Sequence, residues 1–183
     1  NTDNMSILSE TIDYGPYGWM DNYDPDWTPN TTDLPGKRYR FGNQPIIAQW
    51  NLLKLANAIF PLMTDKEEAL SQTIQDFRIQ YASKYQVMMK YKLGLYVDQD
   101  SDESLIYELE QMLKTAEVDM TIFFRLLSNV NKNTDISLII DVISPSFYQD
   151  DIDDDADAKI TSWFEKYLNR LSGEVTTNEE RQT

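Results

Sequence analysis

The chain of 183 residues contains neither cysteine nor histidine. Without cysteine it forms no disulfide and has no thiolate chemistry, which agrees with a reducing compartment. Without histidine it lacks the commonest general base and the commonest metal ligand. Chemistry carried by these residues must therefore use carboxylates, amides and cations, with or without a bound metal.

Long apolar runs and excess positive charge are also missing. No apolar run approaches the ~20 residues that a membrane-spanning helix needs, and no basic stretch followed by an apolar one indicates a signal peptide. The net charge of −15 opposes binding to nucleic acids and anionic membranes, because both attract cationic surfaces. We therefore expect neither as a partner. A nucleotide remains compatible, since a divalent cation can bridge phosphates to carboxylates.

The hydrophobic content of 41% is ordinary for a globular protein. The length suits one domain with its own core, or a piece of a larger protein. Because the sequence begins without methionine, we expect an excised piece or a processed chain.

The first part of the chain, residues 1–45, carries five of the seven prolines and four of the six glycines. Proline fixes φ and removes a backbone donor, so this part is typical of ordered loops and short strands. Its many aromatic residues indicate loops that pack against other elements.

From residue 46 onward, apolar side chains recur at helical spacing. Pro61 stops the first run, Thr64 begins a capping box with Glu67, and Gly94 is a typical residue after a helix end. We expect about five helices, over residues 46–60, 64–94, 101–113, 122–127 and 160–171.

Two acidic runs, residues 98–104 and 150–157, resemble cation-binding loops. A calcium-binding EF-hand loop needs glycine at its sixth position and glutamate at its twelfth, where the first run places Glu103 and Leu109. We interpret this run as a solvated loop that caps the following helix. The second run is interpreted as a surface loop whose aspartates favour the next helix N-terminus, with a weak cation site as the alternative.

The opening stretch NTDNMSILSETIDYGP suggests a site. MSIL and TID are typical of two short antiparallel strands, and a turn at Ser9 and Glu10 would bring Asn4 near Asp13. An amide oxygen beside a carboxylate suits Mg²⁺. Protein kinases use this pair, from the catalytic-loop Asn and the Asp of Asp-Phe-Gly. Asp13 is followed here by tyrosine and glycine. An ordinary hairpin followed by a turn is the alternative interpretation.

The stretch NTDNMSIL…TIDYGPYGWMDNYDP, followed by RYRFGNQPIIAQWNL, resembles the selenoprotein O (SelO) family over about residues 1–55. The resemblance continues more weakly through residues 119–127 and 163–171. Family members have a kinase fold, were long called pseudokinases, and transfer AMP from ATP to hydroxyl side chains of proteins. One departure is visible, since Ser9 and Glu10 replace the Gly-Leu of the family's hairpin.

The resemblance implies roles for three residues. Asp3 matches the family's proposed proton acceptor, Asn4 and Asp13 match its Mg²⁺ ligands, and Asp13 also lies at the ATP phosphates. Mn²⁺ is a possible substitute for Mg²⁺. ATP and proteins with Ser, Thr or Tyr hydroxyls are the implied partners. A bacterial cytoplasm is the expected location, with the mitochondrion as the alternative.

The implied fold is mainly α, a protein-kinase-like C-lobe. Residues 1–45 form the catalytic and metal-binding loop, a short β-hairpin and ordered loops. Residues 46–172 form the helical C-lobe with acidic loops at 98–104 and 150–157, and residues 173–183 form a polar tail. The family's glycine-rich loop and Lys–Glu pair would lie upstream, so we expect the isolated chain to be inactive. A kinase that transfers the γ-phosphate and a non-catalytic helical interaction module remain alternatives.

The segment RYRFGNQP carries two cations, Arg38 and Arg40, that suit phosphates, an acidic substrate or neighbouring carboxylates. We favour a structural role for the segment. Asn43 and Gln44 stand before Pro45 at a predicted helix start, where side-chain hydrogen bonds order a loop.

Overall fold

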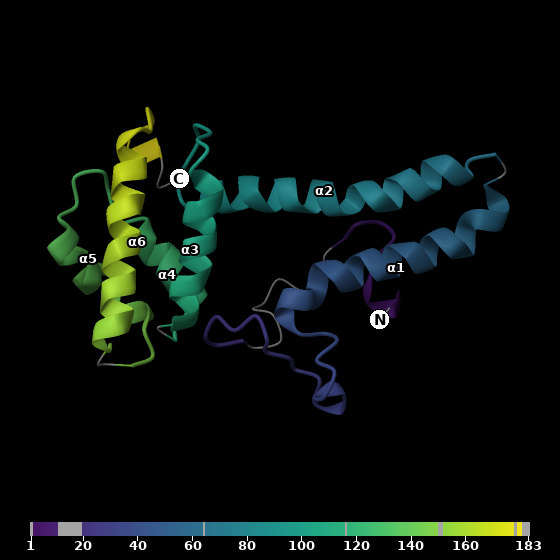
Figure 1. Cartoon of the computed structure of the whole chain (residues 1–183), viewed down its shortest axis with the longest axis horizontal. Helices are drawn as coiled ribbons and strands as arrows, with labels where there is room; N and C mark the ends of the chain where they lie inside the picture. Colours follow the sequence, from purple (N-terminus) through teal and green to yellow (C-terminus); the bar gives the residue numbers. More distant parts are fainter. Residues whose placement is uncertain are drawn as a thin grey trace. The chain divides into compact units, whose positions relative to one another are not determined.

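The computed structural model describes residues 2–10, 20–63, 65–115, 117–149, 152–177 and 179–180. Within these ranges the protein has six α-helices, joined by loops and 3₁₀ turns, and no β-strand (Figure 1). Strand-like pairing is limited to isolated bridges, such as the one between Asn22 and Asp119. The prediction of a mainly α chain is confirmed. In the part of the chain that the structure describes, no helix is long and apolar enough to cross a membrane.

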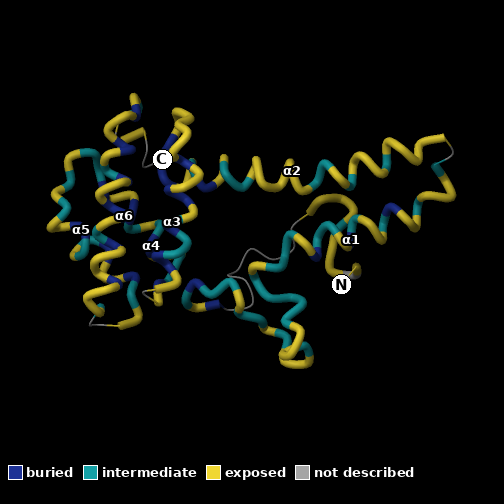
Figure 2. Tube along the Cα trace, viewed as in Figure 1, coloured by how far each residue is buried: buried dark blue, intermediate teal, exposed yellow. Residues whose placement is uncertain are grey.

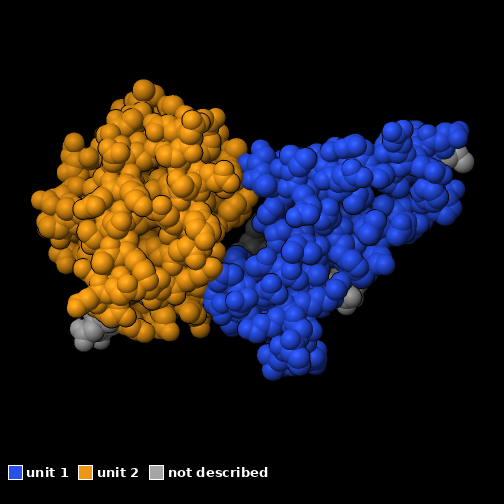
Figure 3. All heavy atoms as spheres, viewed as in Figure 1, with its two compact units in different colours: residues 1–20, 24–84 blue, residues 21–23, 85–183 orange. Residues whose placement is uncertain are grey.

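The chain divides into two compact units, which are described separately (Figure 3). The first unit comprises residues 1–20 and 24–84, and the second comprises residues 21–23 and 85–183.

The first unit is built on helix α1 (Gln44–Ile59). Pro45 stands in its first turn, where a missing N–H costs no intrahelical bond. Pro61 lies in the 3₁₀ turn that follows, so its predicted role as a helix stop is confirmed. The side-chain amide of Gln49 donates to the carbonyl oxygen of Ile74 at 3.2 Å, which joins α1 to helix α2 (Glu67–Lys92).

Helix α2 ends where the sequence predicts. Gly94 adopts a φ of 67°, a left-handed conformation that glycine reaches without a steric penalty. The N–H of Leu95 donates to the carbonyl oxygen of Lys90 at 2.9 Å, across this turn. Leu93 and Leu95 are both buried, so the turn inserts two leucines into the core of the second unit.

The second unit holds the main core. Helices α3 (Asp102–Thr115) and α6 (Asp154–Ser172) pack against each other, and both contain many buried residues, which are dark blue in Figure 2. The core includes an aromatic cluster, in which the rings of Trp163 and Tyr167 stack with centroids 5.0 Å apart. The Trp163 indole N–H donates to the Leu105 carbonyl oxygen at 2.9 Å, so its only polar group is satisfied inside the core.

Helix α4 (Met120–Leu127) and helix α5 (Ile136–Ile143) complete this unit. Each begins at an aspartate, Asp119 or Asp135, whose side chain accepts a backbone N–H of the first turn. The same pattern starts α6, where Asp153 accepts the Ala156 N–H at 2.7 Å. Aspartate is among the preferred residues at this position because it satisfies an otherwise unpaired donor.

Helix α5 is absent from the predicted helices, so the described residues contain six α-helices where about five are expected. Its sequence, ISLIIDVI, is rich in β-branched residues, which favour strands. Tertiary packing decides the outcome, since Ile139 and Ile143 lie one turn apart and are buried.

The predicted β-hairpin is not confirmed. Its first strand, residues 5–8, forms a bend and a turn instead. The Leu8 N–H donates to Ser6 Oγ at 3.2 Å, and Ser9 adopts a φ of 60°, which interrupts an extended backbone. A serine side chain that bonds nearby backbone competes with strand pairing, which explains why the strand prediction is wrong here. The second predicted strand, residues 11–13, lies outside the described residues.

The acidic run at 98–104 is only partly solvated. Asp98 and Asp100 are exposed, as expected of a loop, and Asp98 pairs with Lys90. Asp102 differs, because it is the first residue of α3 and is buried. The interpretation as part of a solvated loop is therefore wrong for Asp102. A buried cation explains why Asp102 is buried while Asp98 and Asp100 are exposed.

That cation is Arg170 of α6. Its Nε lies 2.5 Å from Asp102 Oδ1, and its Nη1 lies 2.7 Å from Glu174 Oε1. All three side chains are at most 6% exposed. Glu174 also accepts the backbone N–H of Tyr96 at 3.0 Å. This buried charge cluster, Asp102, Arg170 and Glu174, therefore joins the start of α3, the end of α6 and the loop between α2 and α3. It also anchors the first residues of the expected polar tail.

The cluster predicts a pH dependence of stability. Burial by itself raises the pKa of Asp102, but hydrogen bonds from Arg170 and from the Gln99 N–H outweigh it, so the pKa lies below its ordinary 3.8. A carboxyl group with a lowered pKa in the folded state stabilises the protein above its unfolded pKa, and this contribution is lost as the pH falls through the folded pKa. At neutral pH the wild-type protein should therefore have a larger free energy of unfolding than the Asp102→Asn variant. The two free energies should converge as the pH falls from about 5 to about 2.

Urea unfolding of both forms, followed by circular dichroism across this pH range, checks the prediction. Other carboxyl groups titrate in both proteins, so only the difference between the two curves reports Asp102. A difference that stays constant down to the lowest pH would contradict it.

Candidate active site

The predicted site residues lie at the N-terminus. Thr2–Asn4 forms a 3₁₀ turn, and the side chain of Asn4 is exposed. The structure places the backbone of Asp3 in this turn. The side chain of Asp3 and the whole of Asp13 lie outside the described residues. The convergence of Asn4 with Asp13 therefore stays a prediction.

Asn4 opens into a pocket of about 420 Å³ in the first unit. The pocket lies between the N-terminal turn, the loop before α1, and α1 itself. Its polar lining consists of Asn4, Asn30, Tyr39, Gln44 and Asn51. Its apolar lining consists of Met5, Pro29, Ile47 and Ala48. Amide and phenol groups on an apolar wall are typical of a small-molecule site, in which a few polar groups orient the ligand.

A second pocket of about 530 Å³ lies beside the first and shares Met5 and Asn51 with it. It is lined by residues of the N-terminal segment, including Thr2 and Ser9, and by α1 residues, including Lys54. The two pockets together flank residues 2–9, in which the sequence predicts the proton acceptor and one metal ligand.

Side-chain hydrogen bonds hold the loop that forms the pocket wall. Gln44 donates its side-chain N–H to the Tyr39 carbonyl oxygen at 2.9 Å, and Asn43 donates to the Arg38 carbonyl oxygen at 2.5 Å. The predicted structural role of Asn43 and Gln44 is therefore confirmed. Arg40 Nε lies 3.1 Å from Asp26 Oδ1, so Arg40 pairs with a neighbouring carboxylate, one of the roles predicted for it.

A close backbone approach fixes the same loop from its other side. The Gly42 N–H donates to the Pro25 carbonyl oxygen at 2.8 Å. A Cβ at position 42 would lie 3.1 Å from that oxygen, a spacing tighter than side chains normally accept. Glycine at this position lets the loop close against residues 25–27 and so shapes the pocket wall.

Arg38 has a different environment from Arg40. Its guanidinium lies 4.7 Å from the centroid of the Trp50 ring and 5.7 Å from that of Tyr39. The Nζ of Lys54 lies 5.0 Å from the Trp50 ring centroid. These distances fall within the range of cation–π attraction.

The donor chemistry of the pocket fits one part of a magnesium site. Mg²⁺ takes oxygen ligands and is commonly held by one or two carboxylates together with substrate phosphates. The Asn4 amide would supply an oxygen, and Asp13 is the predicted carboxylate ligand. Among the residues that the structure describes, no group of three or more Asp or Glu side chains is placed to hold a metal ion.

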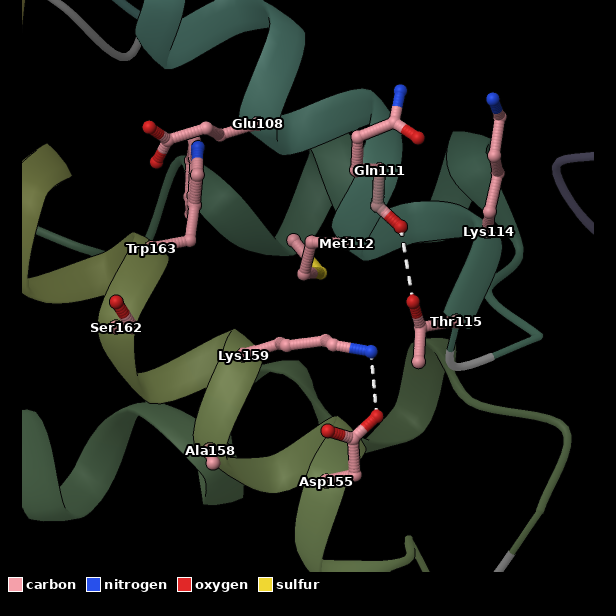
Figure 4. A pocket seen from close by; sticks show the side chains of 10 residues that line it. All are labelled: Glu108, Gln111, Met112, Lys114, Thr115, Asp155, Ala158, Lys159, Ser162 and Trp163. Carbon is pink, nitrogen blue, oxygen red and sulfur yellow. Dashed lines mark hydrogen bonds and ion pairs between the residues drawn. The ribbon is translucent and has the colours of Figure 1, made fainter.

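The second unit has its own pocket of about 520 Å³, between α3 and α6 (Figure 4). Its floor includes Met112 and Trp163, and its rim includes the ion pair of Lys159 Nζ with Asp155 Oδ2 at 2.5 Å. None of the predicted site residues lines it. We therefore assign the candidate site to the first unit.

Several residues that line the pocket of Asn4 are not among the site residues predicted from the sequence. Asn51 is 7% exposed on the buried face of α1, and a polar residue between apolar neighbours on a helix is the signal that would have indicated it. Asn30 and Tyr39 lie in loops, where no periodicity applies. Their approach to Asn4 depends on the loop's side-chain hydrogen bonds.

An amide-lined pocket that includes Asn4 suits a small-molecule ligand. The family model described as "Protein adenylyltransferase SelO" matches residues 1–183. The chain belongs to the SelO family, and the resemblance seen in the sequence is thereby confirmed.

Relatives named protein nucleotidyltransferase YdiU match nearly the whole chain. The protein from Flavobacterium johnsoniae is 48% identical over 182 residues, covering 99% of this chain and 35% of the relative. The protein from Aromatoleum aromaticum is 46% identical, and the match covers 100% of this chain and 34% of the relative. The protein from Rhodopirellula baltica is 42% identical, and the match covers 93% of this chain and 33% of the relative. The chain spans about a third of the length of the curated relatives it matches.

Proposed function

We propose that this chain is the kinase-like C-lobe of a protein adenylyltransferase that uses Mg²⁺ and ATP. The observation that carries the proposal is the match of the SelO family model to every residue of the chain. The exposed Asn4 beside an amide-lined pocket supports it. The proposed substrates are ATP and proteins with Ser, Thr or Tyr hydroxyls. The relatives compared come from bacteria, and we propose the bacterial cytoplasm as the location.

In this reaction the hydroxyl oxygen of the substrate protein attacks the α-phosphorus of ATP. A new O–P bond forms, the bond between the α-phosphorus and the bridging oxygen breaks, and pyrophosphate leaves. The hydroxyl proton passes to the carboxylate of Asp3. Asn4 and Asp13 would hold the metal ion, which would supply positive charge to neutralise the phosphates.

The isolated chain is proposed to be inactive. Phosphorus transfer depends on positioning and on groups that surround the nucleotide from several sides. The chain spans about a third of its relatives, so most of the residues of a full-length relative are outside it. Nucleotide transfer by this chain alone would contradict this part of the proposal.

The proposal predicts which phosphate of ATP reaches protein. The full-length protein is incubated with Mg²⁺ and with ATP labelled on the α- or the γ-phosphate. We expect label on protein only from α-labelled ATP, and we expect Asp13→Ala to abolish it because a metal ligand is lost. Asp100→Ala is the matched control, since Asp100 is an exposed carboxylate in the second unit and its loss should leave labelling unchanged.

The other outcomes separate the alternatives. Label only from γ-labelled ATP would identify a kinase. Label from neither form would favour a non-catalytic interaction module. Loss of labelling in Asp100→Ala as well as in Asp13→Ala would indicate a general effect of charge or folding.

A further inference from the structure

Trp50 on α1 lies between two cations. The guanidinium of Arg38 and the Nζ of Lys54 lie 4.7 Å and 5.0 Å from its ring centroid. The Trp50 side chain is 36% exposed, and Lys54 is exposed. Arg38 is half-buried, and both cations contact the same ring. We call Arg38, Trp50 and Lys54 the cationic stack.

Neither cation of the stack takes part in an ion pair within the described residues. The neighbouring Arg40 does, with Asp26. The chain has 31 acidic and 16 basic residues and is negative overall. Two cations on the same aromatic ring therefore form a local positive site in an acidic protein. Such a site attracts an anionic partner.

The backbone that carries the stack is held in place. The Arg38 N–H donates to Asp33 Oδ2 at 2.6 Å, and the Arg38 carbonyl oxygen accepts from Asn43. Lys54 and Trp50 lie four residues apart on one helix and therefore share a face. A preformed surface loses less entropy when a partner binds.

Exposed apolar side chains continue the stack along α1. Ile46 is 63% exposed and Leu53 is 43% exposed, and with Trp50 they recur at helical spacing on one side of the helix. These residues belong to the apolar stripe that predicts the helix, yet all three side chains are exposed. The surface thus combines two cations with an apolar strip.

We propose that the cationic stack and the apolar strip dock an acidic segment of the substrate protein. The inference rests on the proposed function, for which it names a substrate feature, namely Asp or Glu residues next to an apolar residue. Arg38 also lies over Tyr39, which lines the pocket of Asn4. A segment bound at the stack would therefore lie beside the candidate site. The net charge of −15 opposes a nucleic acid here, and the apolar strip has no role in binding a free phosphate.

Direct binding tests the proposal with the full-length protein. Two fluorescent peptides of equal length, both without hydroxyl side chains, are compared by anisotropy. One places Glu and Asp around a central Leu-Phe pair, and the other has Gln and Asn in their place. We expect the acidic peptide to bind about tenfold more tightly, with an affinity that falls as salt screens the charges.

Charge reversal then localises the binding. Arg38→Glu/Lys54→Glu should weaken binding of the acidic peptide by about tenfold or more. The matched control is Arg78→Glu/Lys84→Glu, which makes the same charge change at two exposed residues of α2 and should leave binding unchanged. Arg38→Gln/Lys54→Gln, with no added negative charge, provides a second variant if the reversal impairs folding, and it should also weaken binding.

Equal binding of the two peptides would overturn the proposal, as would equal effects of the stack and control variants. Because the peptides carry no hydroxyl groups, the result does not depend on AMP transfer. Retained binding without AMP transfer in the labelling experiment would refute the proposed function and leave the acidic docking surface in place.

Discussion

Replacing Arg170 with methionine is expected to lower the free energy of unfolding by about 3–5 kcal/mol. Arg170 is the cation between two buried carboxylates, with Nε 2.5 Å from Asp102 and Nη1 2.7 Å from Glu174. Methionine fills much of the same volume but supplies neither charge nor donors. Two carboxylates would then remain in the interior without the cation that pairs with both of them, which is the costly state of a broken buried ion pair.

Urea unfolding of wild type and variant at neutral pH measures this loss. The matched control is Lys166→Met, which removes a cation of the same helix from an ion pair with Glu108 that is largely exposed. Exposed pairs contribute about 0–1 kcal/mol, so the control should lose little. The triple variant Arg170→Met/Asp102→Asn/Glu174→Gln removes the stranded charges and should recover part of the loss. Equal losses in Arg170→Met and Lys166→Met would contradict the assignment.

The buried charge cluster could not be predicted from sequence. Asp102 stands within a run of acidic residues whose neighbours Asp98 and Asp100 are exposed, and nothing local distinguishes it from them. Its partner Arg170 is 68 residues away along the chain. Only the packing of α3 against α6 brings the two together, and periodicity does not specify which helices pack.

Helices with a regular apolar repeat were predictable, and α6 shows why. Ile160, Trp163, Phe164 and Tyr167 follow a 3.6-residue period, and all are at most 2% exposed. Helix α1 was also predictable as a helix, although its stripe was a poor guide to burial. There the buried residues are Ile47, Asn51 and Ala56, whereas Ile46 and Trp50 are exposed.

The candidate site was predictable only in part. The roles of Asp3, Asn4 and Asp13 stay a prediction, which rests on the types of these residues and their order. The pocket depends on three-dimensional closure. Tyr39 reaches the site because Gln44 and the close approach at Gly42 fold the preceding loop back.

Replacing Asp3 with asparagine should lower the rate of AMP transfer by the full-length protein by about 10²–10⁴-fold, the typical contribution of a positioned acid or base. Asparagine keeps the size and polarity of the side chain but accepts no proton at neutral pH. Because the proposed metal ligands Asn4 and Asp13 are unchanged, the KM for ATP should change little while kcat falls. That split distinguishes loss of a proton acceptor from loss of nucleotide binding.

Transfer of α-phosphate label at several ATP concentrations measures both constants. Asp65→Asn is the matched control, because Asp65 is exposed and its φ of 64° is one that asparagine also tolerates. The control should transfer AMP at the wild-type rate. If Asp3→Asn instead raises the KM for ATP and leaves kcat unchanged, Asp3 acts in holding the nucleotide. The proton would then have to pass to another acceptor.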